Sequence, residues 1–230
     1  RKGSVGGKMT DDGQYFEDIY ISYNREGILS KPRNIGTNIN TEAHEATIGL
    51  SIDGQQLFIY KDDGNNGNIY VSYLHENEWT VPEKMPDPIN TRFQETHATL
   101  QADMKTLYFT SNRKGGFGGL DIYKSMLMPD GTWTKPENLG PEINTPYDEE
   151  GPFIHTDGKT LIFSSKGHNT MGGFDIFYST LERGYWSEPV NIGYPINSTG
   201  EDVFFSSTPD GKRAYYSSYK AGGKGQTDIY

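Results

Sequence analysis

The chain has 230 residues and carries 31 acidic against 21 basic side chains, a formal net charge of −10. Because it contains no cysteine, it cannot be a disulfide scaffold, and it offers neither a thiolate nucleophile nor a cysteine-ligated zinc site. The acidic balance argues against a nucleic-acid backbone as partner, and no apolar run approaches the roughly 20 residues of a membrane-spanning helix.

A three-residue motif recurs along the chain at an almost constant interval. Its first residues are separated by 50, 53, 54 and 53 positions. The five copies are Asp18-Ile19-Tyr20, Asn68-Ile69-Tyr70, Asp121-Ile122-Tyr123, Asp175-Ile176-Phe177 and Asp228-Ile229-Tyr230. A second motif, Ile-Asn-Thr or Ile-Asn-Ser, keeps the same period and begins at Ile39, Ile89, Ile143 and Ile196. This period indicates a repeat protein in which each unit packs against its neighbours.

One repeat unit contains four short segments with strand character. Residues 151–155 and 160–165 flank the turn Asp157-Gly158, a residue pair that favours a tight β-hairpin. Residues 174–179 follow a glycine-rich loop as a third strand, and residues 186–190 form a fourth, whose proline suits a sheet edge. No stretch repeats apolar residues at helical spacing. The pattern predicts an all-β protein, a β-propeller of four-stranded antiparallel blades with about 50–54 residues per repeat.

The repeats fill the chain, so we expect a single propeller domain over residues 1–230. The outer strands of a first blade would occupy 1–36, and the inner strands of a last blade 197–230. Between them the successive repeats cover 39–89, 90–143 and 144–196. Because the chain opens within one blade and ends on the third strand of another, we expect a fragment of a longer chain. Five blades is the economical number, and six stays open.

Several side chains return at the same register of the repeats, and a repeated residue serves a repeated structural need. Aspartates open the turns of the inner hairpins at Asp53, Asp103, Asp157 and Asp210. Tryptophans mark the fourth strands at Trp79, Trp133 and Trp186. Acids follow the second motif at Glu45, Glu95, Glu149 and Asp202. We expect these last acids to bind N–H groups of a neighbouring turn. We expect core packing for the second-strand aromatics Phe58, Tyr108, Phe109, Phe163, Tyr215 and Tyr216.

Two other registers vary from blade to blade near the start of each innermost strand. The residue before the repeated acid is His44, Gln94, Asp148 or Glu201. The residue two positions after it is Thr47, His97, Gly151 or Phe204. Variation on a repeating frame is where a ligand site would be found. The candidate binding rim is therefore His44, Gln94, His97, Asp148 and Glu201. The alternative for each of them is a solvated loop edge.

Catalysis by carboxylates needs an acid and a base with different pKa values, which identical environments cannot provide. We therefore expect no catalytic residue and no enzyme activity. A glycan-binding or glycoside-hydrolysing propeller remains the alternative, with the carboxylates Asp148, Glu149, Glu201 and Asp202. We expect no cofactor and no metal. The loop Asp62–Asn68 is rich in oxygen ligands, but it lacks the spacing of an EF-hand, so a plain hairpin loop is favoured and calcium stays an open question.

The repeat resembles a known family. The segment from Asp157-Gly158-Lys159 through Phe163-Ser164-Ser165, followed by Asp175-Ile176-Phe177, resembles the TolB-type, WD-repeat-like propeller repeat. The tryptophan, proline and Ile-Asn-Thr pattern between blades is similar to a subgroup found in OmpA-family envelope proteins, including a component of type IX secretion. The resemblance implies a non-enzymatic interaction scaffold in the periplasm, associated with the outer membrane. Its partners would be envelope proteins and, through a flanking domain, peptidoglycan.

Two copies depart from the pattern. The second copy reads Tyr60-Lys61-Asp62-Asp63 where the others have serine and a basic residue after the second strand. The hairpin turn at Asp103-Met104 lacks its glycine. Neither departure changes the period.

Overall fold

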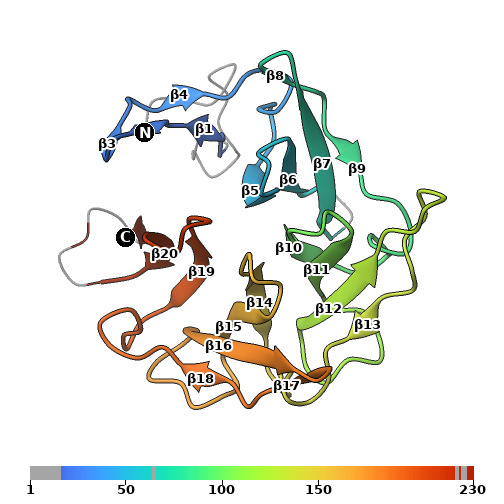
Figure 1. Ribbon diagram of the computed structural model, residues 1–230, viewed down its shortest axis with the longest axis vertical. Helices are drawn as coiled ribbons and strands as arrows, with labels where there is room; N and C mark the ends of the chain where they lie inside the picture. Colours follow the sequence, from blue (N-terminus) through green and yellow to red (C-terminus); the bar gives the residue numbers. More distant parts are fainter. Residues whose placement is uncertain (1–16, 64–65, 221–222, 224–226) are drawn as a thin grey trace.

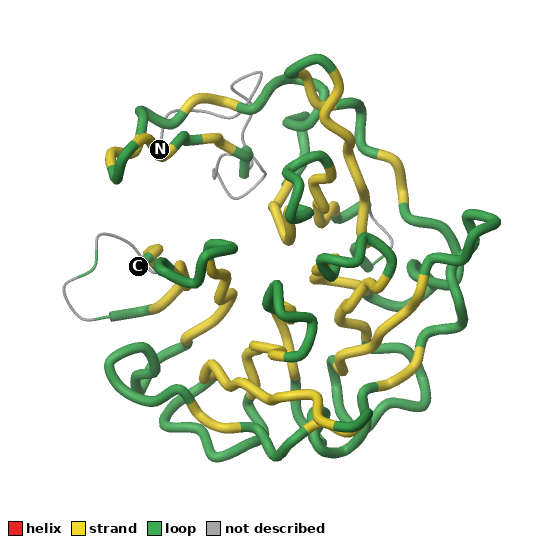
Figure 2. Tube along the Cα trace, viewed as in Figure 1, coloured by secondary structure: helices red, strands yellow, loops and turns green. Residues whose placement is uncertain are grey.

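The computed structural model describes residues 17–63, 66–220, 223 and 227–230. Within these ranges every regular element is a β-strand (Figure 2), so none of the described residues belongs to a helix that could cross a membrane. The strands form separate sheets that are arranged around a common centre as the blades of a β-propeller (Figure 1). The predicted fold class is thus confirmed.

Four sheets contain an innermost strand, and these four strands, β5, β10, β14 and β19, lie nearest the centre in Figure 1. The first of these sheets contains β5 (Glu45–Leu50), β6 (Gln56–Lys61), β7 (Asn68–His75), β8 (Glu78–Trp79) and β9 (Glu83–Lys84). The next contains β10 (Glu95–Leu100), β11 (Thr106–Ser111), β12 (Asp121–Met126) and β13 (Glu137–Asn138). The third contains β14 (Glu149–Ile154), β15 (Thr160–Ser165), β16 (Asp175–Glu182), β17 (Tyr185–Trp186) and β18 (Val190–Asn191).

The two ends of the chain contribute partial sheets. The last sheet contains β19 (Asp202–Ser207), β20 (Ala214–Ser218) and β21 (Asp228–Ile229). Near the other end lie two strand pairs: β1 (Tyr20–Ile21) with β4 (Arg33–Asn34), and β2 (Asn24–Arg25) with β3 (Ile28–Leu29). Figure 1 shows these pairs in the ring between the β5–β9 and β19–β21 sheets. The number of blades in the complete ring stays a prediction, and residues 1–16 of the expected first blade lie outside the described residues.

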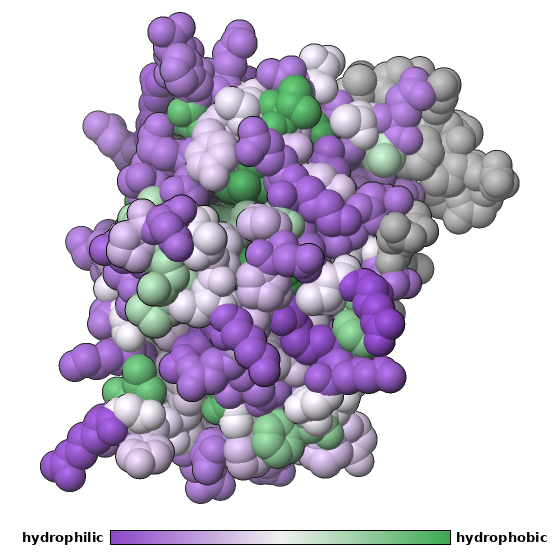
Figure 3. All heavy atoms as spheres, turned by 90° about the vertical axis from the view of Figure 1, so that its right-hand side faces the viewer, coloured by the Kyte–Doolittle hydropathy of each residue, from purple (hydrophilic) through white to green (hydrophobic). Residues whose placement is uncertain are grey.

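The outer part of the three blades that contain β7, β12 and β16 differs from the expected single fourth strand. In the β14–β18 blade, Trp186 of β17 pairs with Leu181, whereas Val190 of β18 pairs with Tyr178 farther along the same strand, β16. The residues between the two pairings include Pro189, which has no N–H to donate to the ladder. The outer edge is therefore two short pairings around a proline. Figure 3 faces the outer parts of the β5–β9 and β10–β13 blades and shows a mostly hydrophilic surface with scattered apolar residues.

The inner hairpin turns are held by the repeated aspartates. Asp157 accepts the N–H groups of Lys159 and Thr160, both at 2.8 Å, and Gly158 has φ +67°. Burial opposes ionisation, yet these donors lower the pKa of Asp157 to about 2. In the copy without glycine, Met104 takes the same left-handed conformation at φ +58°. The backbone bonds to the aspartate of that turn keep its shape without glycine.

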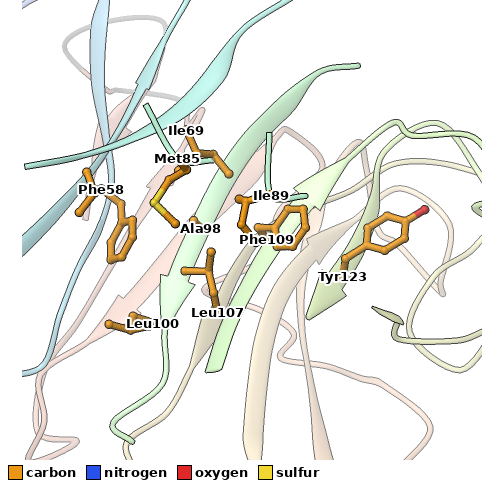
Figure 4. Packing of buried hydrophobic residues seen from close by; sticks show 10 residues of the cluster. Phe58, Ile69, Met85, Ile89, Ala98, Leu100, Leu107, Phe109 and Tyr123 are labelled. Carbon is orange, nitrogen blue, oxygen red and sulfur yellow. The ribbon is translucent and has the colours of Figure 1, made fainter. Parts of the chain in front are cut away.

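Apolar side chains fill the spaces between neighbouring sheets. Figure 4 shows the cluster between the β5–β9 and β10–β13 sheets, where Phe58, Ile69 and Met85 meet Ala98 and Leu107. A second cluster joins the β10–β13 and β14–β18 sheets. The predicted core aromatics Phe58, Tyr108, Phe109 and Phe163 are buried, which confirms them, while Tyr215 and Tyr216 are half-buried. The partly buried tryptophans pack against three such clusters, at Trp79, Trp133 and Trp186.

The asparagine of the Ile-Asn-Thr motif fastens the loop between blades. Asn144 accepts the N–H of Ile122 at 2.7 Å and donates to the carbonyl of the same residue at 2.9 Å. Its amide thereby pairs with the third strand as a neighbouring backbone would. The same two bonds recur at Asn40, Asn90 and Asn197. All four asparagines are buried, so this amide satisfies backbone groups that have no access to water.

Candidate functional site

The repeated acids near the ring centre are occupied by structural hydrogen bonds. Glu149, whose exposed fraction is 0 %, accepts bonds from the Thr145 N–H at 2.7 Å, the Thr145 hydroxyl at 2.6 Å and the Ser165 hydroxyl at 2.7 Å. The same set of donors surrounds Glu95 and Asp202, and Glu45 binds both donors of Thr41. These carboxylates stabilise the turn that enters each blade, and they are inaccessible to a ligand.

A cation or an imidazole fastens the same turn in three blades. The Arg113 guanidinium lies between the rings of Phe109 and Tyr123, at 4.9 and 5.1 Å, and donates to the Ile89 carbonyl and to Glu95. His168 and Lys220 occupy the corresponding places, each against two aromatic rings and one carbonyl. Whereas Glu45 and Glu95 have ion pairs with Lys61 and Arg113, Glu149 has no ion pair with any residue that the structure describes. Burial raises the pKa of Glu149 to about 7, although its three hydrogen bonds oppose this.

In the second copy of the repeat, the carboxylate near the start of the third strand comes from a different residue. In the β14–β18 blade, Asn191 donates to Asp175 at 2.8 Å. In the β5–β9 blade the acid is replaced by Asn68, and Asp63 supplies the carboxylate instead, with the Lys84 ammonium 2.9 Å away. Lys84 therefore balances the charge of Asp63, one of the two carboxylates of the oxygen-rich loop. Residues 64 and 65 of that loop lie outside the described residues, so calcium binding there stays an open question.

Three of the candidate rim residues connect neighbouring blades. Asp148 accepts the Leu120 N–H at 3.0 Å, and Glu201 accepts the Phe174 N–H at 2.9 Å. His44 does the same for the N–H of Glu17 at 3.4 Å. The donors lie 27 or 28 positions earlier in the sequence, in the preceding blade, so no local pattern revealed them. These residues of the candidate rim therefore also hold neighbouring blades together.

Gln94 differs from those three, since its connections are made by its backbone. Its N–H donates to the side chain of Asn112 at 2.8 Å, and its carbonyl accepts the N–H of the same residue at 3.2 Å. The half-buried Gln94 side chain forms no hydrogen bond to the described residues.

Two aromatic side chains from different blades meet near the centre of the propeller. The imidazole of His97 on β10 lies 4.7 Å from the ring of Phe204 on β19, although the β14–β18 sheet separates their blades in the sequence. Each of these strands has a bulge at this level, and Phe204 has φ +60°. A bulge turns a side chain away from the regular alternation, here toward the centre. Burial lowers the pKa of His97 to about 4, so its ring is neutral at physiological pH.

Glu150, which sequence reasoning did not single out, directly precedes Gly151, whose backbone lies against the ring of Phe204. Its register holds Ala46, Thr96 and Val203 in the other blades, so the acid is specific to one blade. Burial, together with the carboxylates of Asp148 and Glu201, raises the pKa of Glu150 to about 7, while Lys166 acts in the opposite direction. A lone acid at a non-repeating register was the one available signal, and the adjacent repeated acid at position 149 masked it.

Comparison with known proteins supports the fold. No protein-family model matches the sequence, and no curated protein matches it. Among solved structures, TolB from Acinetobacter baumannii aligns with a TM-score of 0.54 at 13 % identity, over 86 % of this chain and 42 % of that one. A putative TolB from Agrobacterium tumefaciens gives 0.53 at 18 %, over 88 % and 70 %.

An enzyme shares the same likeness. The α-L-arabinofuranosidase from Lactobacillus brevis aligns with a TM-score of 0.52 at 17 % identity, over 88 % of this chain and 78 % of that one. At such identities the similarity establishes a TolB-like β-propeller fold and leaves the activity open. The chain spans less than half of the first TolB structure and more than two thirds of the other two proteins.

Proposed function

We propose that this chain is a non-enzymatic β-propeller module that docks a protein partner through the inner ends of its blades, by which we mean the first residues of the innermost strands β5, β10, β14 and β19. We place it in the bacterial periplasm, in an outer-membrane-associated and peptidoglycan-linked secretion or envelope complex, on the strength of its repeat pattern. The single observation that carries the docking proposal is the contrast between two sets of residues. Repeated acids are buried in structural bonds, whereas the blade-specific rings of His97 and Phe204 are in contact and Phe204 lies against Gly151, the residue after Glu150.

The geometry gives less support to glycoside hydrolysis. Of the four carboxylates that this alternative required, Glu149 and Asp202 have exposed fractions of 0 %, and neither can contact a sugar in the folded protein. Asp148 and Glu201 each commit one oxygen to a backbone N–H of the preceding blade. A glycosidase needs two accessible carboxyl groups on opposite sides of the scissile bond. The remaining acid, Glu150, would have to find its partner among groups already engaged in the frame.

A matched pair of variants tests the docking proposal in the full-length protein. Phe204→Ala removes an aromatic side chain near the centre of the propeller, where Phe204 has an exposed fraction of 45 %. Tyr178→Ala removes a ring of comparable exposure, 37 %, from the outer part of the β14–β18 blade. Partners captured from a native envelope extract would be identified, purified and titrated against both variants and the parent protein.

We expect Phe204→Ala to weaken a purified partner at least about tenfold and Tyr178→Ala to change its Kd less than about twofold, since an aromatic anchor dominates its surroundings. Equal Kd values for the two variants would contradict docking at the inner ends. Release of sugar from aryl glycosides by the parent protein, abolished in Glu150→Gln, would contradict the non-enzymatic part of the proposal.

A further inference from the structure

The Glu150 cluster, defined here as Glu150, Asp148, Glu201 and Lys166, has more negative than positive charge. Lys166 is its one ammonium, 3.5 Å from an oxygen of Asp148 and 4.3 Å from the ring centroid of Phe174. The Glu150 carboxylate, in contrast, forms no hydrogen bond to any described residue. One oxygen of Glu201 is likewise without a hydrogen bond among the described residues, because only the other accepts the Phe174 N–H. Two carboxylate groups therefore retain unused acceptors.

A buried hydroxyl beside Glu150 is also without a partner. Ser164 on β15 is the direct cross-strand neighbour of Glu150, so both side chains lie on the same face of the sheet. Ser164 has an exposed fraction of 0 %, and its hydroxyl oxygen has no hydrogen-bond partner among the residues that the structure describes. Buried polar groups in proteins are almost always paired, so the Ser164 hydroxyl is an unfilled polar position beside the Glu150 carboxylate, and the Thr110 hydroxyl at the same register of the β10–β13 blade shares that state.

An aromatic surface adjoins these unused acceptors. The ring of Phe204 lies against the backbone of Gly151, the residue after Glu150, where a Cβ would approach within 3.1 Å of Phe204 Cδ1. Gly151 has φ +57°, a conformation in which glycine is favoured, and it lets the ring approach. The His97 ring is tilted by 31° against Phe204 with the ring centroids 4.7 Å apart, Phe204 keeps an exposed fraction of 45 %, and the neutral imidazole does not repel a cation. A carboxylate next to an exposed phenyl ring matches a planar cation with an apolar stem.

We propose that the Glu150 cluster and Phe204 bind an arginine side chain of the docked protein partner. This inference rests on the proposed function and names the chemistry of its partner. The guanidinium donates to the carboxylates of Glu150 and Glu201, and its plane stacks on Phe204. Arginine fits better than lysine because its flat, multi-donor group serves two carboxylates and a ring face together. A guanidinium also offsets the excess of negative charge in this cluster, which contains three acids and one lysine.

Dye-labelled peptides test the proposal with the full-length protein. The probe has one arginine between glycine and serine residues, and its control has the uncharged isostere citrulline at that place. Binding is measured by fluorescence anisotropy for the parent protein, Glu150→Gln and Glu188→Gln. Glu188 is an exposed acid in the same blade, outside the cluster, so its variant makes the same change in net charge. Phe204→Leu is the variant for the stacking contact.

We expect the arginine peptide to bind at least about fivefold more tightly than the citrulline peptide. Glu150→Gln should weaken the arginine peptide about five- to tenfold and Phe204→Leu about threefold, while Glu188→Gln leaves it unchanged. Equal affinity for both peptides, or equal effects of the two glutamine substitutions, would overturn the arginine site. If Phe204→Ala releases the natural partner and Glu150→Gln does not, docking stands and this inference fails. If neither variant affects the partner, the docking proposal itself fails.

Discussion

Removing the side chains of the adjacent residues Glu149 and Glu150 should change the stability by very different amounts, because one is part of the structural frame and the other is not. Glu149→Ala leaves the Thr145 N–H and two hydroxyls without their acceptor inside the protein. A buried group that loses its partner costs about 1–3 kcal/mol, and relief of the buried charge offsets part of the sum. We expect a net loss of about 2–4 kcal/mol in the free energy of unfolding.

Glu150→Ala, by contrast, breaks no hydrogen bond to the described residues. At pH 8 it also removes repulsion from Asp148 and Glu201. We expect its free energy of unfolding to lie within about 1 kcal/mol of the parent value. The assay is urea denaturation followed by the fluorescence of the three tryptophans. Equal losses in the two variants would refute the division between structural and blade-specific acids.

Three further outcomes follow from the same contacts. Glu150→Gln should be more stable than the parent protein above pH 7 by on the order of 1 kcal/mol, because a folded-state pKa raised from 4.5 to about 7 costs stability as pH rises through that window. The difference should vanish below about pH 4.5, and a difference that grows on acidification in a pH series of melts would contradict it. Asn144→Ala should lower the free energy of unfolding in urea by about 2–3 kcal/mol, since it leaves the N–H and carbonyl of Ile122 without partners. A loss below about 0.5 kcal/mol would show that the two hydrogen bonds of Asn144 are dispensable. Gly151→Ala should lower the free energy of unfolding by about 1–2 kcal/mol, and adding Phe204→Ala should recover part of it, whereas additive losses would place the strain elsewhere.

The sequence predicted the blade well because the repeat exposes what each blade shares. The period placed the inner hairpins, the turn aspartates and the core aromatics Phe58, Tyr108, Phe109 and Phe163 without any long-range information. The turn at Met104 shows how robust that frame is, since the aspartate bonds preserve a left-handed conformation that glycine adopts elsewhere. The outer strand was less predictable, because Pro189 interrupts a ladder whose two halves pair independently.

The candidate site could be predicted only in part, because its members come together through blade packing. Asp148 and Glu201 were selected for their variability, yet their bonds to the preceding blade became evident only in three dimensions. His97 and Phe204 come from strands of non-neighbouring blades. Glu150 was overlooked because its burial and its proximity to Lys166 and Glu201 are tertiary properties. A repeat reveals the common frame, whereas a site built on it depends on what differs between copies.

The central claim is that the inner ends of the blades dock a protein partner. The most direct measurement is the Kd of the purified envelope partner for the full-length protein, compared between Phe204→Ala and Tyr178→Ala. The account predicts at least about a tenfold loss for the inner substitution and less than about a twofold change for the outer one. A partner that binds both variants as tightly as the parent protein would contradict the claim and place the interface on another surface.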